Sequence, residues 1–212
     1  MIKRTSQDYI QSILSKKSDW KILDIGCGYS ANTFATTICD VQDLSEFYKE
    51  KNFIKLNSKN LPFKDKEFDF VILSHVMEHV ANLIEFKNEI ERIGKEGYIE
   101  LPSKLNDNIV FGCDEEILGH KWWFEFDDDK QELLYTPKVD AIEKFLSVAQ
   151  VWKFQKFYED SFVLQFHWKD KINIKEREPF IVEKKITFLQ LIKKYYSKKI
   201  RVFISRLKNI FN

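Results

Sequence analysis

The chain has 212 residues, of which 44% are hydrophobic and 15% aromatic, and its formal net charge is +1. This length and composition exclude a disordered or fibrous protein and allow one domain with a buried core. The three cysteines, Cys27, Cys39 and Cys113, are irregularly spaced, which is typical of free thiols in a reducing compartment and excludes a disulfide framework.

The first half of the chain alternates between strand and helix patterns. Apolar residues at helical spacing predict helices over residues 6–15 and 82–93. Strands are predicted over five short apolar segments, namely residues 21–25, 36–39, 53–56, 68–73 and 98–101. This alternation predicts an α/β fold with a doubly wound, mostly parallel, Rossmann-like sheet.

The second half predicts an antiparallel C-terminal part. Residues 122–126 and 132–135 flank an acidic run and read as a hairpin. Thr136 followed by Pro137 predicts a helix start, with Ile142, Phe145, Leu146 and Ala149 on its buried side. Two more strands are then expected over residues 151–157 and 162–168. We assign one domain to residues 1–183, with a substrate-side insertion at about 103–135, and a separate tail to residues 184–212.

A glycine turn follows the first predicted strand. In Asp24-x-Gly26-x-Gly28, the glycines allow the backbone to pass close to a ligand at the carboxyl edge of the sheet. A following helix would add its amide-rich N-terminus, although only 11 residues separate Gly28 from Asp40 and this helix must be short. The segment also fits the dinucleotide-binding fingerprint, but a carboxylate at Asp24 would repel phosphates. A ligand that carries an amine suits the turn better.

Several motifs in order carry a resemblance to one family. Ile22-Leu23-Asp24-Ile25-Gly26-Cys27-Gly28 resembles the first motif of class I S-adenosylmethionine-dependent methyltransferases. The segments Leu61-Pro62-Phe63, Phe68-Asp69-Phe70-Val71 and His75-Val76-Met77-Glu78-His79-Val80 resemble the middle of the subgroup called methyltransferase type 11, and residues 93–102 continue it. The resemblance covers roughly residues 20–103 and implies S-adenosylmethionine as the cofactor.

The resemblance also implies roles for residues in the cofactor site. Asp24, Gly26, Cys27 and Gly28 would line the methionine end of the cofactor. Asp40, with Asp43 as second choice, would hold the ribose hydroxyls, which needs two acceptor oxygens. The remaining contacts would be made near the adenine and over the fourth strand's end, by Asn57, Ser58, Leu61, Ser74 and His75. Asp40 and Asp43 can equally be solvated loop acids.

The histidine motif allows a second class of function. His75-x-x-Glu78-His79 matches the inverted zinc-peptidase motif, which requires one helix that directs both imidazoles to a metal. A peptidase leaves the glycine turn unexplained, so we expect no bound metal. In a methyltransferase, Glu78 and His79 would lie near the methyl acceptor, and His79 is a candidate base for a hydroxyl acceptor. Packing at a helix start is the competing interpretation of His79.

The predicted insertion contains candidate substrate residues. His120, Trp122 and Trp123 lie beside an acidic run and could form an aromatic platform for a sugar or another polar ring. Strand alternation places Trp122 with Phe124 and leaves Trp123 on the opposite face, where we expect it to be the more exposed tryptophan. Packing in the core of the hairpin is the alternative for these side chains.

The tail has the pattern of a basic amphipathic helix. Residues 184–212 carry nine Lys or Arg and no acidic residue, whereas residues 1–183 carry 25 basic and 33 acidic residues. Apolar residues recur in the tail at helical spacing, at Leu189, Ile192, Tyr196, Ile200, Phe203, Leu207 and Ile210. Such a helix can lie on an anionic membrane or pack within the protein or its dimer, and nucleic acid is less favoured because the rest of the chain is acidic.

We therefore expect a cytoplasmic enzyme that transfers a methyl group from S-adenosylmethionine to a small-molecule, glycan or lipid-linked acceptor. No run of 18 apolar residues occurs, so any membrane contact would be peripheral, at the inner membrane face. The alternative is a methyltransferase-like fold that binds a ligand or a partner without catalysis. The sequence assigns neither the acceptor nor an oligomeric state.

Overall fold

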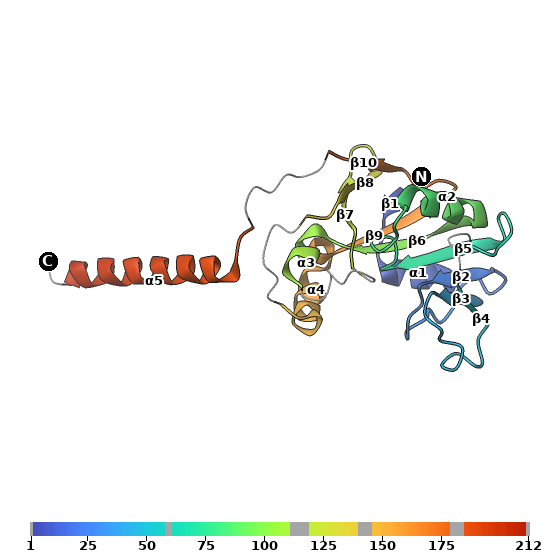
Figure 1. The fold of residues 1–212 in the computed structure, drawn as a ribbon, viewed down its shortest axis with the longest axis horizontal. Coiled ribbons are helices and arrows are strands. Elements are labelled where there is room, and N and C mark those ends of the chain that lie inside the picture. The colour runs from blue at the N-terminus through green and yellow to red at the C-terminus, as the bar shows by residue number, and fades with distance from the viewer. Residues whose placement is uncertain (1, 58–60, 111–118, 140–145, 179–184, 211–212) are drawn as a thin grey trace.

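The computed structural model describes residues 2–57, 61–110, 119–139, 146–178 and 185–210. Its strands are β1 (Ile2–Arg4), β2 (Ile22–Ile25), β3 (Thr37–Asp40), β4 (Phe53–Lys55), β5 (Phe68–Ser74), β6 (Gly94–Pro102), β7 (Trp122–Asp127), β8 (Glu132–Pro137), β9 (Val163–Lys169) and β10 (Ile174–Glu176). Its helices are α1 (Gln7–Leu14), α2 (Leu83–Ile93), α3 (Lys104–Ile109), α4 (Val148–Phe162) and α5 (Phe188–Ile210). Figure 1 shows these elements.

A seven-stranded sheet forms the centre of the molecule, in the order β1-β9-β6-β5-β2-β3-β4. The five strands from β6 to β4 are parallel, whereas β9 runs antiparallel to β6 and β1 runs antiparallel to β9. The α/β fold with a mostly parallel sheet is thus confirmed, as is the antiparallel C-terminal part. Because the parallel strands share one carboxyl edge, the segments that follow β2, β3 and β5 all emerge there.

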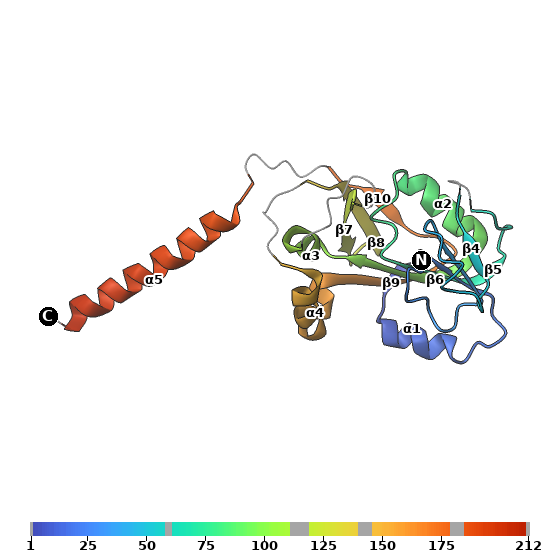
Figure 2. The same cartoon turned by 60° about the horizontal axis from the view of Figure 1, so that its bottom comes forward.

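Two helices cover opposite faces of this sheet, as Figure 2 shows for α1 and α2. Helix α1 begins after Ser6, whose side chain accepts a hydrogen bond from the Tyr9 amide, and it buries Ile10 and Leu14 against one face. Helix α2 begins after Asn82, whose side chain accepts a hydrogen bond from the Glu85 amide, and it packs on the other face of the sheet. Both helices confirm the predictions for residues 6–15 and 82–93.

A second sheet, in the order β10-β8-β7, packs on the α2 side of the main sheet. The β7–β8 hairpin confirms the prediction, and the rings of Phe126 and Phe166 lie 4.6 Å apart between the two sheets. The predicted helix start at Thr136 and Pro137 is wrong, because both residues belong to β8. Pro137 is tolerated there because it lies beyond the residues that pair with β10. Ile142 and Phe145 lie outside the described residues.

Two further expectations about secondary structure are wrong. Residues 151–157 form part of helix α4 and not a strand, whereas the strand expected at 162–168 is present as β9. The predicted short helix after Gly28 is replaced by turns in residues 26–36, because too few residues are available for a helical crossover between β2 and β3. Side chains satisfy part of this backbone: Tyr48 Oη accepts from Ala31 and Asp24 Oδ2 accepts from Asn32.

Helix α5 extends away from the two sheets in Figures 1 and 2. Its described apolar side chains, including Leu189 and Phe203, are mostly exposed. Among the helices of the described ranges, none combines the length and apolarity that a bilayer crossing requires. Helix α5 itself confirms the helix predicted for the tail.

Candidate functional site

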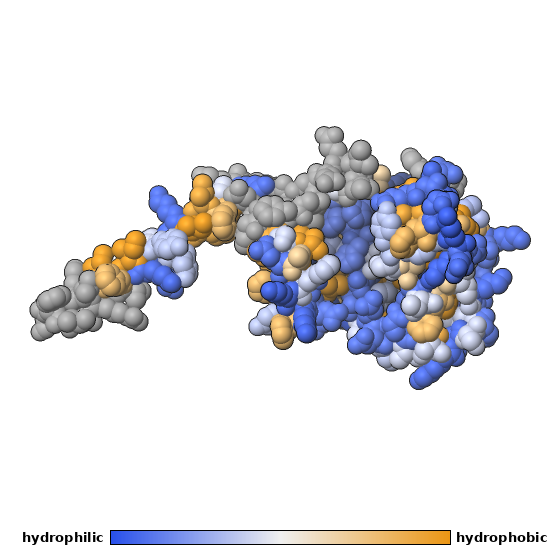
Figure 3. Space-filling model, turned by 90° about the horizontal axis from the view of Figure 1, so that it is seen from below, coloured by the Kyte–Doolittle hydropathy of each residue, from blue (hydrophilic) through white to orange (hydrophobic). Residues whose placement is uncertain are grey.

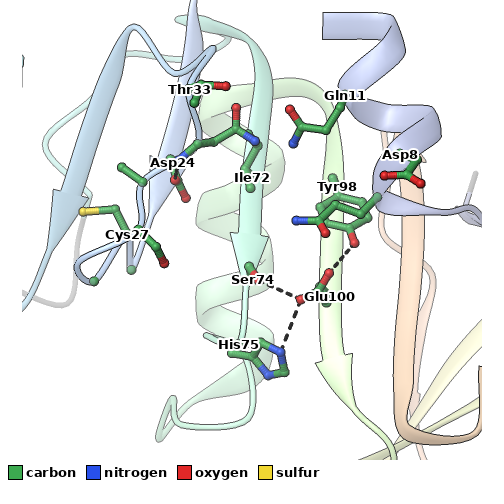
Figure 4. Close-up of a pocket in the computed structure, with 16 residues that line it drawn as sticks. Asp8, Gln11, Asp24, Cys27, Thr33, Ile72, Ser74, His75, Tyr98 and Glu100 are labelled. Carbon is green, nitrogen blue, oxygen red and sulfur yellow. Dashed lines mark hydrogen bonds and ion pairs between the residues drawn. The ribbon is translucent and has the colours of Figure 1, made fainter. Parts of the chain in front are cut away.

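A cleft of about 720 Å³ opens at the carboxyl edge of the parallel strands. In Figure 4, Asp24 and Cys27 lie on one side of the view and α1 lies on the other, with β5 and β6 between them. The turn after β2 supplies Asp24, Gly26, Cys27 and Gly28 to the lining. Helix α1, strands β5 and β6 and the residue that follows β5 add polar side chains to the lining, and these are Gln7, Asp8, Gln11, Ser74, His75, Tyr98 and Glu100.

The turn itself depends on its two glycines. Gly26 has a φ of +68° and Gly28 a φ of +48°, which is the left-handed region that L side chains rarely adopt. A Cβ on Gly26 would lie 2.6 Å from Cγ2 of Val76, whereas a Cβ on Gly28 would meet no atom within 4 Å. The turn therefore keeps open space above Gly28 for a ligand.

Asp24 is a buried carboxylate beneath this turn. Its Oδ2 accepts a hydrogen bond of 2.7 Å from the amide of Asn32. Burial raises the pKa of Asp24 to about 6, although this hydrogen bond acts in the opposite direction. Burial also raises the pKa of the neighbouring Cys27 thiol to about 12, so Cys27 is a neutral thiol at physiological pH. Cys27 and Cys39 are free thiols as expected, and Cys113 lies outside the described residues.

Asp40 ends β3 just behind the turn, but it does not line the cleft. Its Oδ2 accepts a hydrogen bond of 2.9 Å from the Gly28 amide and its Oδ1 accepts one of 2.8 Å from the Gln42 amide. Asp40 therefore holds the glycine turn in place, and its role toward ribose hydroxyls stays a prediction. Asp43, the second choice, is exposed and accepts a hydrogen bond from Ser45.

The residues expected near an adenine are not brought together at the cleft. Asn57 is exposed and absent from the lining, and Ser58 lies outside the described residues. Leu61 is buried in the main hydrophobic core. By contrast, Ser74 and His75 line the cleft at the end of β5, as the sequence analysis expected.

His75 and Glu100 form a charged pair at the rim of the cleft. Glu100 Oε1 lies 3.3 Å from Nε2 of His75 and accepts a hydrogen bond of 3.0 Å from Ser74, as Figure 4 shows. Nδ1 of His75 lies 3.2 Å from Oε1 of Glu78. Burial opposes the imidazolium, but the hydrogen bonds to Glu100 and Glu78 outweigh it and raise the pKa of His75 to about 10. Since 44% of the His75 side chain is exposed, solvent screens its ion pair with Glu100. The pKa of His75 is nevertheless raised, which keeps the imidazole charged at neutral pH.

Glu100 is the ionised partner. Burial alone would raise its pKa, but hydrogen bonds from His75, Tyr98 and Gln165 outweigh this and lower the pKa to about 2. The Tyr98 hydroxyl donates to Glu100 Oε2 at 2.5 Å and the Gln165 amide donates to the same oxygen at 3.1 Å. Sequence reasoning missed Tyr98 and Glu100. Their polar groups two residues apart in a buried strand were the available signal, because alternate residues share one face of a strand.

A second cleft of about 400 Å³ shares Gln7, His75 and Glu100 with the first. Its other lining residues come from α4 and β9, and they are Trp152, Gln155, Lys156, Glu159, Val163 and Gln165. Trp152 is 65% exposed, and Gln165 donates hydrogen bonds to both Glu100 and Glu159. The two clefts therefore meet at the His75–Glu100 pair.

The residues predicted for the substrate line neither cleft. Trp123 is buried, which contradicts its expected exposure: its Nε1 donates to Asp107 of α3 at 3.0 Å. His120 Nδ1 also contacts Asp107, and Trp122 Nε1 donates to the Val80 carbonyl at 2.7 Å. The hairpin is held by these buried hydrogen bonds because a desolvated indole N–H or carboxylate requires a partner.

Glu78 contacts His75, but neither Glu78 nor His79 lines either cleft. The segment from His75 to Val80 forms turns, so the helix that a zinc peptidase requires is missing from this fully described segment. Glu78, His79 and His120 nevertheless place one potential ligand atom each within 4.8 Å of one another. The absence of a bound metal remains a prediction.

Residues 23–99 match the family model described as a methyltransferase domain, which confirms the resemblance to methyltransferase type 11. An uncharacterized protein of Methanocaldococcus jannaschii is 40% identical over 86 residues, which are 37% of this chain and 38% of that protein. A ubiquinone biosynthesis O-methyltransferase of Rickettsia bellii is 34% identical over 113 residues, covering 46% of this chain and 47% of that protein. The matched region thus spans less than half the length of either relative.

The chain is also similar to a solved SAM-dependent methyltransferase from Aquifex aeolicus. The TM-score is 0.40 with 15% sequence identity, and the likeness covers 76% of this chain and 87% of that one.

Proposed function

We propose that this protein, whose residues 23–99 match a methyltransferase domain, transfers a methyl group from S-adenosylmethionine and binds that cofactor in the larger cleft. The observation that carries the proposal is the buried carboxylate of Asp24 beneath the turn through Gly26 and Gly28. A carboxyl group with a pKa of about 6 is mostly ionised at neutral pH, so it suits the amino group of the cofactor. The same charge disfavours a pyrophosphate, which argues against a dinucleotide.

The cleft has the dimensions that such a cofactor needs. Its volume of about 720 Å³ lies within the range of ordinary cofactor pockets, and Gly28 leaves the space beside its backbone open. Bound S-adenosylmethionine supplies a methyl group on a positively charged sulfur. Asp24 would hold the amino group, and the rim at Ser74 and His75 would close over the opposite part of the cofactor.

The acceptor would approach through the smaller cleft, because His75 and Glu100 line both clefts. In-line transfer depends mainly on alignment of the acceptor atom with the methyl carbon and on exclusion of water. Both oxygens of Glu100 already have two donors each, Ser74 and His75 on Oε1 and Tyr98 and Gln165 on Oε2, so Glu100 would fix the rim between the clefts and not hold the acceptor itself. Since its pKa is lowered to about 2, Glu100 is a poor base, and the proton of a hydroxyl acceptor would leave to solvent as the new bond to the methyl carbon forms.

The lining of the smaller cleft favours a small polar acceptor, free or attached to a glycan or lipid. Gln155, Lys156, Glu159 and Gln165 offer hydrogen-bond donors and acceptors beside the exposed indole of Trp152. An aromatic face next to amide and charged groups suits a hydroxylated ring. The O-methyltransferase relative from Rickettsia bellii agrees with an oxygen acceptor.

The test is calorimetric titration of S-adenosylmethionine and S-adenosylhomocysteine into the purified protein. We expect saturable binding that Asp24→Asn weakens at least tenfold, because the substitution removes the charge and keeps the shape. Asp19→Asn changes the same group on an exposed turn and should leave binding unchanged.

Failure of the intact protein to bind either compound would overturn the proposal. Binding without release of S-adenosylhomocysteine, across acceptor fractions from a cell extract, would instead identify a binding module without catalysis.

A further inference from the structure

Helix α5 presents two chemically different faces to solvent. Leu189, Tyr196, Ile200 and Phe203 are spaced by seven, four and three residues, so they share one face of the helix. Leu189 is 75% exposed and Phe203 is 62% exposed, and a contiguous exposed apolar face is typical of an interaction surface. Figure 3 shows apolar and hydrophilic side chains side by side along this helix, away from the body.

Three basic residues occupy the opposite face, whereas Lys193 and Lys199 flank the apolar face. Lys194, Lys198 and Arg201 follow one another at spacings of four and three residues, about half a turn around the helix from the apolar face. Residues 184–212 contain nine Lys or Arg and no Asp or Glu, so no charge within the segment offsets them. A surface that contacts both faces must therefore combine apolar material with dense negative charge.

We infer that α5 binds in the headgroup region of an anionic phospholipid membrane, with its apolar face toward the acyl chains. A helix of 23 residues with a strong polar face and low overall hydrophobicity is suited to this position and not to a bilayer crossing. Tyr195 and Tyr196 add amphipathic rings that fit the level of the headgroups. Lysine side chains can extend from the same helix to the lipid phosphates.

An anionic bilayer satisfies both faces along the whole helix at once. The acidic body of the protein would satisfy the charge, yet α5 extends away from it in both ribbon views, and the described apolar side chains of α5 are mostly exposed. A second copy of α5 would cover the apolar face but would bring two strongly basic segments together. The membrane surface avoids that repulsion, and this inference stands independently of the cofactor cleft.

The test is co-sedimentation of the full-length chain with phosphatidylcholine vesicles that do or do not contain phosphatidylglycerol. We expect binding to the anionic vesicles, weaker binding at high salt, and little binding to pure phosphatidylcholine. Replacing Lys194, Lys198 and Arg201 together by Gln should weaken binding roughly 100-fold, since each basic residue near such a surface contributes close to a factor of five.

A matched control removes three exposed lysines from the body, through Lys16→Gln, Lys49→Gln and Lys55→Gln, and should leave vesicle binding within about twofold. Leu189→Gln with Phe203→Gln should also weaken binding, because the apolar face is then interrupted. Equal loss in the body control, equal binding to neutral vesicles, or no binding at all would overturn the inference. So would a dimer in analytical ultracentrifugation that the Leu189 and Phe203 variant dissociates, because a second copy would then cover α5.

Discussion

Replacing Gly26 or Gly28 with alanine tests the geometry of the cofactor turn, because the two positions share a backbone conformation but differ in their surroundings. Both have positive φ, so alanine at either position should cost about 1–2 kcal/mol of folding free energy through backbone strain. At Gly26 the new Cβ would also lie 2.6 Å from Val76, which adds roughly 1–3 kcal/mol of overpacking. Gly26→Ala should therefore destabilise the protein more than Gly28→Ala.

Urea unfolding followed by far-ultraviolet circular dichroism measures both costs, provided that the slope with denaturant is unchanged. The decisive control is a double-mutant cycle with Val76→Ala: the paired substitution should recover most of the extra cost at Gly26 and none of the cost at Gly28. Equal destabilisation by the two alanines, or no coupling between Gly26 and Val76, would refute the reasoning. Gly28→Ala should weaken cofactor binding more than Gly26→Ala does, because the Gly28 Cβ would project into open space at the cleft.

Three further predictions concern buried polar groups. The pKa of Asp24 is raised from 3.8 to about 6, so the burial of this carboxylate lowers the stability of the fold as pH rises between these values. Asp24→Asn should therefore raise the free energy of unfolding in urea by up to about 3 kcal/mol at pH 7. A gain over the parent that is no larger at pH 7 than at pH 4 would contradict this. Trp123→Phe should cost about 1–3 kcal/mol of folding free energy, because it removes the indole donor to the buried carboxylate of Asp107. Trp152→Phe, at an exposed site, should change the folding free energy by less than about 0.5 kcal/mol. Similar values for both variants would contradict the burial argument. Elemental analysis of the purified protein should find no stoichiometric metal, and stoichiometric zinc would refute that expectation. The group that would then hold it consists of Glu78, His79 and His120.

The elements predicted correctly are those in which local pattern and tertiary position agree. In β2 and β5, alternate residues pack on opposite faces of the sheet, so Ile22 and Phe70 meet α1 while Leu23 and Val71 face the α2 side. The turn after β2 was also readable, since its glycines and Asp24 are adjacent in sequence. The faces of the two strands follow from the two-residue periodicity, and the turn follows from residues that are neighbours in the chain.

The helix α4 shows where local pattern was ambiguous. Its aromatic residues fit a strand by composition, yet a helix start was readable four residues earlier, at Ser147 and Gln150. In the structure the Ser147 amide donates to Gln150 Oε1 at 2.8 Å, which is half of a capping box. Strands β1 and β10 were missed because each has one apolar residue followed by two charged residues, whereas β4, which is equally short, begins with two apolar residues.

The residues at the junction of the two clefts could not be predicted as a group. Gln7 lies in α1, Glu100 in β6 and Trp152 in α4, and no local spacing relates them. They meet because β9 runs antiparallel to β6 and brings α4 to the same edge as the parallel strands. The sheet order that causes this depends on long-range pairing, which a single sequence does not reveal.

Unfavourable local features nevertheless gather at the larger cleft. Gly26, Gly28 and His75 all have positive φ, and all three line the same space as the buried carboxylate of Asp24. The buried carboxylate and the positive φ of a non-glycine residue each cost folding free energy, and both lie at one edge of the sheet, beside a turn that glycine adopts without strain. A protein selected for stability alone would replace Asp24 with an apolar residue and His75 with a residue that favours positive φ. Their coincidence therefore argues that this edge is shaped for a ligand, and the gain expected from Asp24→Asn measures how much stability the protein forgoes to bind it.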